Sequence, residues 1–146
     1  MKTMSSLAAS TLLVLFMHAC SAPEKEIPAN RDLTWTYTYL KANEGQRENL
    51  KQIVIKNWFV MDSIAVDQGI LSSYELIENQ NKADSTAWDF IVAVEYFTAN
   101  TYADIAEEFS AIRQAHQTVK VNGQTFPQAG RVVKSETVKK HKYGRQ

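Results

Sequence analysis

The sequence predicts an α+β domain in which two helices cover one face of a four-stranded antiparallel sheet. Residues 33–40 alternate threonine with aromatic residues, which is the two-residue period of a β-strand. Residues 88–97 are almost all apolar, as expected of a strand that is buried on both faces. Between these strands, apolar residues spaced three and four apart from Leu50 to Ala65 indicate a long amphipathic helix.

The first helix carries recognisable signals at both ends. Asn43 is a favoured N-cap residue, and Gln46 is placed to complete a capping box with it. Gly69 is a favoured residue just after a helix C-terminus. A helix of about 24 residues is roughly 36 Å long, so we expect it to kink or to overhang the sheet.

The remaining elements follow in the order strand, strand, helix, hairpin and strand. Residues 70–77 and 131–138 are more polar than the other strands and are therefore predicted to lie at the edges of the sheet. Thr101 is predicted to cap the second helix, whose apolar stripe reaches Ile112. Asn122-Gly123, between two short strand-like segments, is typical of a tight hairpin turn.

The element order β-α-β-β-α-β, with a small hairpin before the last strand, is that of the ferredoxin-like fold. Right-handed crossovers put the first and third strands at the centre of the sheet and the second and fourth at its edges. Both helices then cover the same face, yet the third strand is apolar on both faces. Because large bare apolar patches are uncommon on monomers, a second copy of the sheet is the predicted cover.

The element order and the entry into the second strand at Gly69-Ile70 resemble the dimeric α+β barrel superfamily over residues 33–138. That superfamily includes small monooxygenases, haem-degrading enzymes and stress-response proteins. The resemblance implies a homodimer whose paired sheets form a barrel. It contains no invariant motif, so it does not imply one particular activity.

The N-terminal residues have the pattern of an export signal. Lys2 is followed by an apolar segment, residues 7–19, that is too short to span a bilayer. Met17-His18-Ala19-Cys20 resembles the lipobox of bacterial lipoproteins, which implies that Cys20 is lipidated and becomes the new N-terminus. Cys20 is the only cysteine, so it has no partner for an internal disulfide. The alternative is an ordinary signal peptide that leaves a free thiol at Cys20.

These features divide the chain into four parts. We expect a signal peptide at residues 1–19, a proline-containing tether at 20–31, the ferredoxin-like domain at 32–138 and a basic tail at 139–146. Two or three acyl chains would hold the protein durably at a membrane of the cell envelope. In the lipoproteins that the lipobox resembles, a serine after the cysteine, here Ser21, favours the outer membrane over the inner one.

The composition is that of a globular domain, with 45% apolar and 22% charged residues. Residues 20–130 hold nine basic and fifteen acidic residues, whereas residues 131–146 hold six basic residues and one acidic residue. This balance argues against a nucleic-acid partner. The basic tail could contact anionic lipid headgroups. A frayed, solvated terminus is the alternative that we favour.

The aromatic residues of the first strand are candidate ligand-binding residues. Trp35, Tyr37 and Tyr39 share one face of that strand. They could stack against a flat organic ligand in a cavity between two paired sheets. Packing as core beneath the helices is the alternative that we favour for these three residues.

Glu95 is a second candidate because it lies among apolar residues in the third strand. Burial there would raise the pKa of its carboxyl group and suit it to acid–base chemistry. The alternatives that we favour are an ion pair with Lys134 or Arg131 on an adjoining strand, or contact with solvent near the end of the sheet.

His116 continues the stripe of the second helix and is the residue that could ligate a haem. The alternative that we favour is a histidine that helps to satisfy the last carbonyl groups of the helix. No other cofactor is predicted, and no spacing of histidines, thiols and carboxylates indicates a metal site. Asp62 and Asp67 are predicted to face solvent, away from the apolar stripe of the first helix.

Two functions are compatible with the sequence. The first is a non-enzymatic envelope lipoprotein that binds a small apolar molecule or a protein partner through a dimeric barrel. The second is a small monooxygenase or isomerase that uses the cavity between the sheets, with Glu95 or His116 as its polar group. The sequence contains no catalytic triad or phosphate-binding loop, and this favours the first function.

Overall fold

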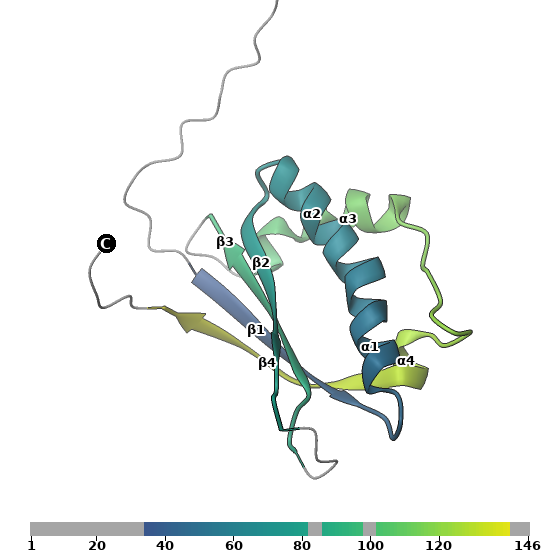
Figure 1. The fold of residues 1–146 in the computed structure, drawn as a ribbon. Helices are drawn as coiled ribbons and strands as arrows, with labels where there is room; N and C mark the ends of the chain where they lie inside the picture. The colour runs from purple at the N-terminus through teal and green to yellow at the C-terminus, as the bar shows by residue number, and fades with distance from the viewer. Residues whose placement is uncertain (1–33, 82–85, 98–101, 141–146) are drawn as a thin grey trace, which may run out of the picture.

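Four strands form one antiparallel sheet in the computed structural model, in the order β2-β3-β1-β4 (Figure 1). The structure describes residues 34–81, 86–97 and 102–140. The predicted signal peptide and tether, and the chain from His141 onward, lie outside the described residues. The elements in chain order are β1 (Thr34–Ala42), α1 (Arg47–Ile53), the π-helical turn η1 (Val54–Trp58), α2 (Phe59–Asp67), β2 (Leu71–Glu78), β3 (Phe90–Tyr96), the 3₁₀ turn η2 (Tyr102–Ile105), α3 (Ala106–Ala115), α4 (Phe126–Ala129) and β4 (Gly130–Lys139).

The strand order confirms the predicted ferredoxin-like arrangement. β1 and β3 lie at the centre, and β2 and β4 lie at the two edges. The four residues 90–93 at the start of β3 are all buried, whereas most of β4 is exposed. The apolar strands therefore occupy the interior of the sheet and the polar ones its edges.

The helices lie together on one side of the sheet (Figure 1). Thr36 and Thr38 of β1 face this helical layer, because they line a cavity together with residues of α2 and α3. Side chains alternate between the two faces of a strand. Trp35, Tyr37 and Tyr39 therefore lie on the opposite, helix-free face, and the interpretation of these residues as core beneath the helices was wrong.

Residues 47–67 form one helical run in which α1 and α2 are joined by the π-helical turn η1 (Figure 1). A π-helical turn holds an additional residue, so the residues after it are rotated relative to a regular α-helix. The buried positions Asn57 and Asp62 are consequently five residues apart, while Ile64, which the three-and-four spacing places on the buried stripe, is 39% exposed. The predicted long helix is present, but its second half presents a different side to the sheet.

Two apolar clusters fill the space between helices and sheet, and Val94 of β3 packs against both. One contains Leu40, Leu50, Ile53, Val54, Phe90, Val92, Val121 and Ala129. The other contains Ala65, Leu71, Tyr96, Ile105, Phe109 and Ile112. Val92 of the first cluster and Leu71 of the second line the same cavity, which therefore lies where the clusters meet.

The predicted hairpin turn is confirmed. Asn122 and Gly123 both have positive φ, at 48° and 77°, and Val121 forms a bridge with Gln124 around them. The short helix α4, which was not predicted from the sequence, follows directly and is capped by reciprocal contacts between Thr125 and Gln128.

A candidate ligand-binding cavity between the helices and the sheet

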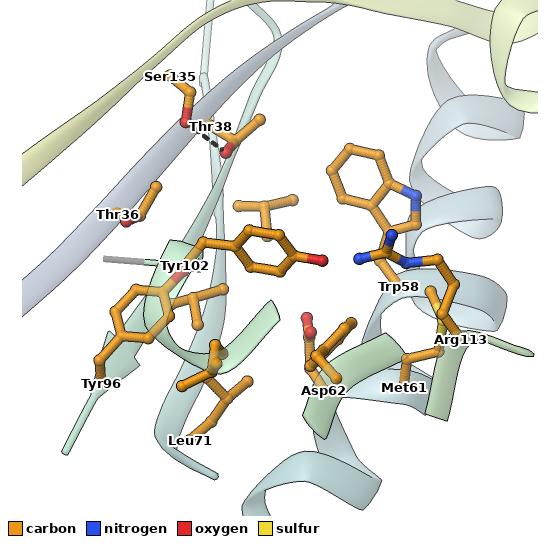
Figure 2. Close-up of a pocket in the computed structure, with 14 residues that line it drawn as sticks. Thr36, Thr38, Trp58, Met61, Asp62, Leu71, Tyr96, Tyr102, Arg113 and Ser135 are labelled. Atoms are coloured by element: carbon orange, nitrogen blue, oxygen red, sulfur yellow. Dashed lines mark hydrogen bonds between the residues drawn. The ribbon is translucent and has the colours of Figure 1, made fainter. Parts of the chain in front are cut away.

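A cavity of about 510 Å³ lies between the helical layer and the sheet (Figure 2). The strands contribute its floor, and the π-helical turn, α2, η2 and α3 contribute its walls. The lining residues are Thr36, Thr38, Trp58, Met61, Asp62, Leu71, Val92, Val94, Tyr96, Tyr102, Ile105, Phe109, Arg113 and Ser135. Most of this lining is apolar or aromatic, as is usual for sites that bind small organic molecules.

The aromatic walls are held by contacts among their own members. The rings of Tyr102 and Phe109 meet edge to face, with their centroids 5.9 Å apart. On the opposite wall, the Trp58 ring is stacked on Phe126 at 5.0 Å. These contacts fix the rings before any ligand arrives, which reduces the entropy that binding would cost.

Asp62 is the acidic residue of the cavity lining. Its side chain comes from α2, is only 7% exposed and points into the cavity (Figure 2). Burial raises the pKa of its carboxyl group from 3.8 to about 7. Contrary to the sequence prediction, Asp62 does not face solvent, because the π-helical turn rotates it inward; Asp67 is exposed as predicted.

Two further polar groups reach the same space. Figure 2 shows the Tyr102 hydroxyl and the Arg113 guanidinium group pointing toward the centre of the cavity. The Arg113 guanidinium carbon lies 5.6 Å from the centroid of the Tyr102 ring and 5.8 Å from that of Phe109. Arg113 is exposed, so it lies at the mouth of the cavity rather than at its base.

The hydroxyl groups on the floor of the cavity have partners of their own. Thr38 and Ser135 share a hydrogen bond of 3.0 Å across β1 and β4 (Figure 2). Burial raises the pKa of the Tyr96 phenol, and the neighbouring Thr36 hydroxyl partly offsets this effect. Asp62 differs from these groups, because its carboxylate accepts no hydrogen bond from the described residues.

The predicted aromatic residues lie outside this cavity, on the helix-free face. Lys140 lies over the Trp35 ring, with its ammonium nitrogen 3.2 Å from the ring centroid. Lys134 lies over Tyr39 in the same way, at 4.2 Å. The charged ends of two lysines thus cover much of an aromatic surface within one chain, and Trp35 is only 8% exposed.

Glu95 also lies on the helix-free face. It accepts hydrogen bonds of 2.9 Å from the hydroxyl groups of Ser72 and Ser73 on β2. The expected ion pair with Lys134 or Arg131 was wrong, because β1 separates β3 from β4 in the sheet.

His116 ends α3 and does not line the cavity. Its Nε2 lies 3.1 Å from Oδ1 of Asn57, a buried residue in the π-helical turn. The same Asn57 oxygen accepts a hydrogen bond from the Val119 amide at 2.7 Å, and its amide nitrogen donates to the carbonyl groups of Ile53 and Val119. His116 therefore helps to fasten the loop after α3 to the first helix, a role that is structural.

One signal in the sequence could have indicated Asp62. The segment Phe59–Asp67 is apolar on nearly all sides and therefore has no clear polar face. A polar residue within this segment is not reliably placed toward solvent. Nothing in the sequence locates the π-helical turn, which determines whether the Asp62 side chain faces the cavity or the solvent. Tyr102 and Arg113 depend on the packing of α3 against the sheet, which no local pattern specifies.

Comparisons with known proteins add a structural likeness alone. No family model matches the chain, and no curated protein matches it. Among solved structures, the crystal structure of HapK from Hahella chejuensis is similar, with a TM-score of 0.48 and 11% sequence identity over 77% of this chain and 97% of that one. Within the described residues, no helix is long and apolar enough to cross a membrane, and no cluster of three or more potential metal ligands occurs.

Proposed function

We propose that this domain binds a small, largely apolar ligand in the cavity between its helices and its sheet. The cavity is the observation that carries the proposal. Its volume of about 510 Å³ lies within the roughly 300–1,000 Å³ common for small-molecule sites. Its walls are aliphatic and aromatic, so an apolar ligand would gain mainly from leaving water.

We further propose that the protein is delivered to the cell envelope as a lipoprotein anchored through Cys20. The lipobox-like residues before Cys20 and the lack of a second cysteine support this proposal. The segment 20–31 would then separate the binding domain from the lipid surface.

A cavity-filling substitution tests ligand binding. Val94 lines the cavity from β3, and Val94→Phe would place a ring in the space that a ligand needs. Val133→Phe makes the same change on β4, where Val133 is 47% exposed. The chain from Ser21 onward, which contains every described residue, would be titrated with the neutral fluorescent probe N-phenyl-1-naphthylamine.

We expect Val94→Phe to weaken binding of the probe about tenfold or more and Val133→Phe to leave it unchanged. Circular dichroism would establish that both variants fold. Equal affinities in the two variants, or no binding by the unaltered chain, would contradict the proposal.

Asp62 favours a second candidate, an enzyme that moves a proton. A carboxyl group with a pKa of about 7 in an apolar cavity is suited to act as a general acid or base near neutrality. The test uses NMR to measure whether solvent deuterium replaces the protons on the carbon next to the carbonyl group of a bound aryl ketone. Exchange by the unaltered protein that disappears in Asp62→Asn would support an enzyme.

A further inference from the structure

We propose that the ligand of this cavity carries a basic nitrogen, protonated in water, which pairs with the carboxylate of Asp62. The inference rests on the proposed function, because it names the chemical class of the ligand that the same cavity would bind. It arises from a buried acidic group on the wall of an aromatic cavity that has no partner among the described residues.

Asp62 is more than nine-tenths buried, yet within the described chain its carboxylate has neither a hydrogen-bond donor nor an ion-pair partner. Asn57 and Asp89, the other two buried polar residues of the described chain, are well satisfied. Asp89 accepts from the Ala42 amide and pairs with Lys41 and Arg47, and Asn57 uses both ends of its amide group. Burying a lone carboxylate is costly, so a missing counter-charge at Asp62 points to a ligand that supplies it.

The groups that face Asp62 supply little compensating charge. β3 contributes the Tyr96 phenol, η2 contributes Tyr102, and α3 contributes Arg113. The lining residues of β1, β2 and β4 are uncharged: Thr36, Thr38, Leu71 and Ser135. Arg113 forms no ion pair with Asp62, since its guanidinium group is held over the rings of Tyr102 and Phe109.

The aromatic walls also suit a cationic ligand. The rings of Trp58, Tyr96 and Tyr102 surround the space that Asp62 faces (Figure 2). The faces of aromatic rings attract ammonium groups, and the attraction grows when water is excluded. A carboxylate beside aromatic rings in one cavity is therefore a combination that favours a protonated amine on an apolar body.

The pH dependence of binding distinguishes an amine from other ligands. Burial raises the pKa of Asp62 to about 7, so the carboxylate form that pairs with an amine becomes available as the pH rises through that value. A ligand that accepts a hydrogen bond from the protonated acid would show the opposite trend. An anionic ligand held by Arg113 would also bind less well as Asp62 ionises.

Three probes of matched shape test the inference in the chain from Ser21 onward: 2-(1-naphthyl)ethylamine, 2-(1-naphthyl)ethanol and 1-naphthaleneacetic acid. At about pH 8.5 we expect the amine to bind roughly tenfold to 100-fold more tightly than the alcohol, as for hydrogen bonds to charged groups. At about pH 5 this preference should largely disappear, because Asp62 is then protonated. Isothermal titration calorimetry measures all three affinities.

Asp62→Asn should abolish the preference for the amine over the alcohol at about pH 8.5. Asp67→Asn removes an exposed carboxylate from the same helix and should change neither affinity. Equal binding of amine and alcohol, or tightest binding of the acid, would overturn the amine proposal while ligand binding itself stands. Failure of all three probes to bind would overturn both proposals.

Discussion

Asp62 makes the stability of the folded domain depend on pH. Burial raises the pKa of this carboxyl group from 3.8 to about 7, so the folded state holds the proton more tightly than the unfolded chain does. The resulting stabilisation is fully present below the unfolded value and is lost as the pH rises through about 7. The full difference in proton affinity corresponds to roughly 4 kcal/mol, an upper bound on the effect.

Asp62→Asn should therefore raise the thermal midpoint at about pH 8, where the native carboxylate is charged, and should change it little at about pH 4. The asparagine keeps the shape of the side chain and removes the charge. Asp67→Asn is the matched control and should have no effect at either pH, because Asp67 is exposed. Identical pH profiles for Asp62→Asn and the unaltered protein would show that Asp62 is not buried as the structure has it.

Gly130 illustrates a steric requirement at a single residue. It begins β4 with φ of −178°, an extended conformation open to any residue. A Cβ atom at this position would lie 2.6 Å from the Lys41 carbonyl oxygen and 2.7 Å from Cδ2 of Leu50. The Lys41 oxygen belongs to the backbone of β1 and cannot move without disturbing the pairing of the two strands.

Gly130→Ala should accordingly lower the free energy of unfolding by about 1–3 kcal/mol, as other overpacking substitutions do. Gly123→Ala is an informative comparison, because Gly123 has open space around it but a φ of 77°. Its cost should be about 1–2 kcal/mol and should come from the backbone conformation alone. Urea unfolding measures both, and a Gly130→Ala variant as stable as the unaltered protein would contradict the packing described here.

At the scale of the elements, the π-helical turn connects the first helix to the loop that follows α3. Its Asn57 side chain is hydrogen-bonded to Ile53, His116 and Val119. The π-helical turn thus carries the buried Asn57 amide group, whose oxygen and nitrogen atoms are both hydrogen-bonded. This group supplies hydrogen-bond partners to the backbone of the loop after α3, which would otherwise lack them.

Asn57→Ala should cost about 1–3 kcal/mol of stability, because it removes a buried amide group and with it the hydrogen bonds to Ile53, His116 and Val119. Hydrogen exchange of the Val119 amide should become faster at the same time. Asn49→Ala, on the same helix, removes hydrogen bonds to Gln46 and Asn122 at a less buried site and should cost under about 1 kcal/mol. Similar losses in the two variants would contradict a special role for the π-helical turn.

The elements of this fold could be predicted from the sequence because periodicity and local turn chemistry specify them. The alternation of β1, the apolar run of β3 and the Asn122-Gly123 turn all appear as expected. The side to which an element turns was harder to predict. In β1 either face could have been the buried one, since threonines pack beneath the helices while lysines cover Trp35 and Tyr39.

The candidate site could not be predicted for a related reason. Asp62 enters the cavity because one turn of the helix is π-helical, and the rotation cannot be inferred from a regular three-and-four spacing. Glu95 and His116 stand out in the sequence by type, but both are occupied by structural partners. Residue type indicated possible chemistry, whereas tertiary packing decided which group remains free for a ligand.

For the whole molecule, we propose that two copies pair through the helix-free face of the sheet. That face carries Lys134 and Lys140 beside Glu75 and Glu136, which pair within one chain as Lys134–Glu136 and Lys140–Glu75. A two-fold axis would let the same four residues exchange partners between copies, because a face with both charges can be complementary to itself. The exposed charges predict a pairing that salt weakens.

Sedimentation equilibrium of the chain from Ser21 onward should show a dimer at low ionic strength and dissociation at about 1 M salt. Glu75→Lys should weaken the dimer by placing like charges together. Glu107→Lys, on the exposed side of α3, makes the same change elsewhere and should leave the dimer intact. A monomer at low salt would contradict the pairing, and Lys134 and Lys140 would then cover the aromatic rings without a second copy.

The position of the whole protein in the cell depends on Cys20, in the segment before the described residues. If Cys20 carries two or three acyl chains, the protein should fractionate with membranes and partition into detergent, and Cys20→Ser should release it into the soluble fraction. Ser21→Ala keeps the thiol and changes the neighbouring residue, so it should leave the protein with the membranes. Metabolic labelling with palmitate should mark the unaltered protein and Ser21→Ala, but not Cys20→Ser. Unchanged fractionation of Cys20→Ser would refute the anchor, and the cavity would then have to be supplied with its ligand away from any lipid surface.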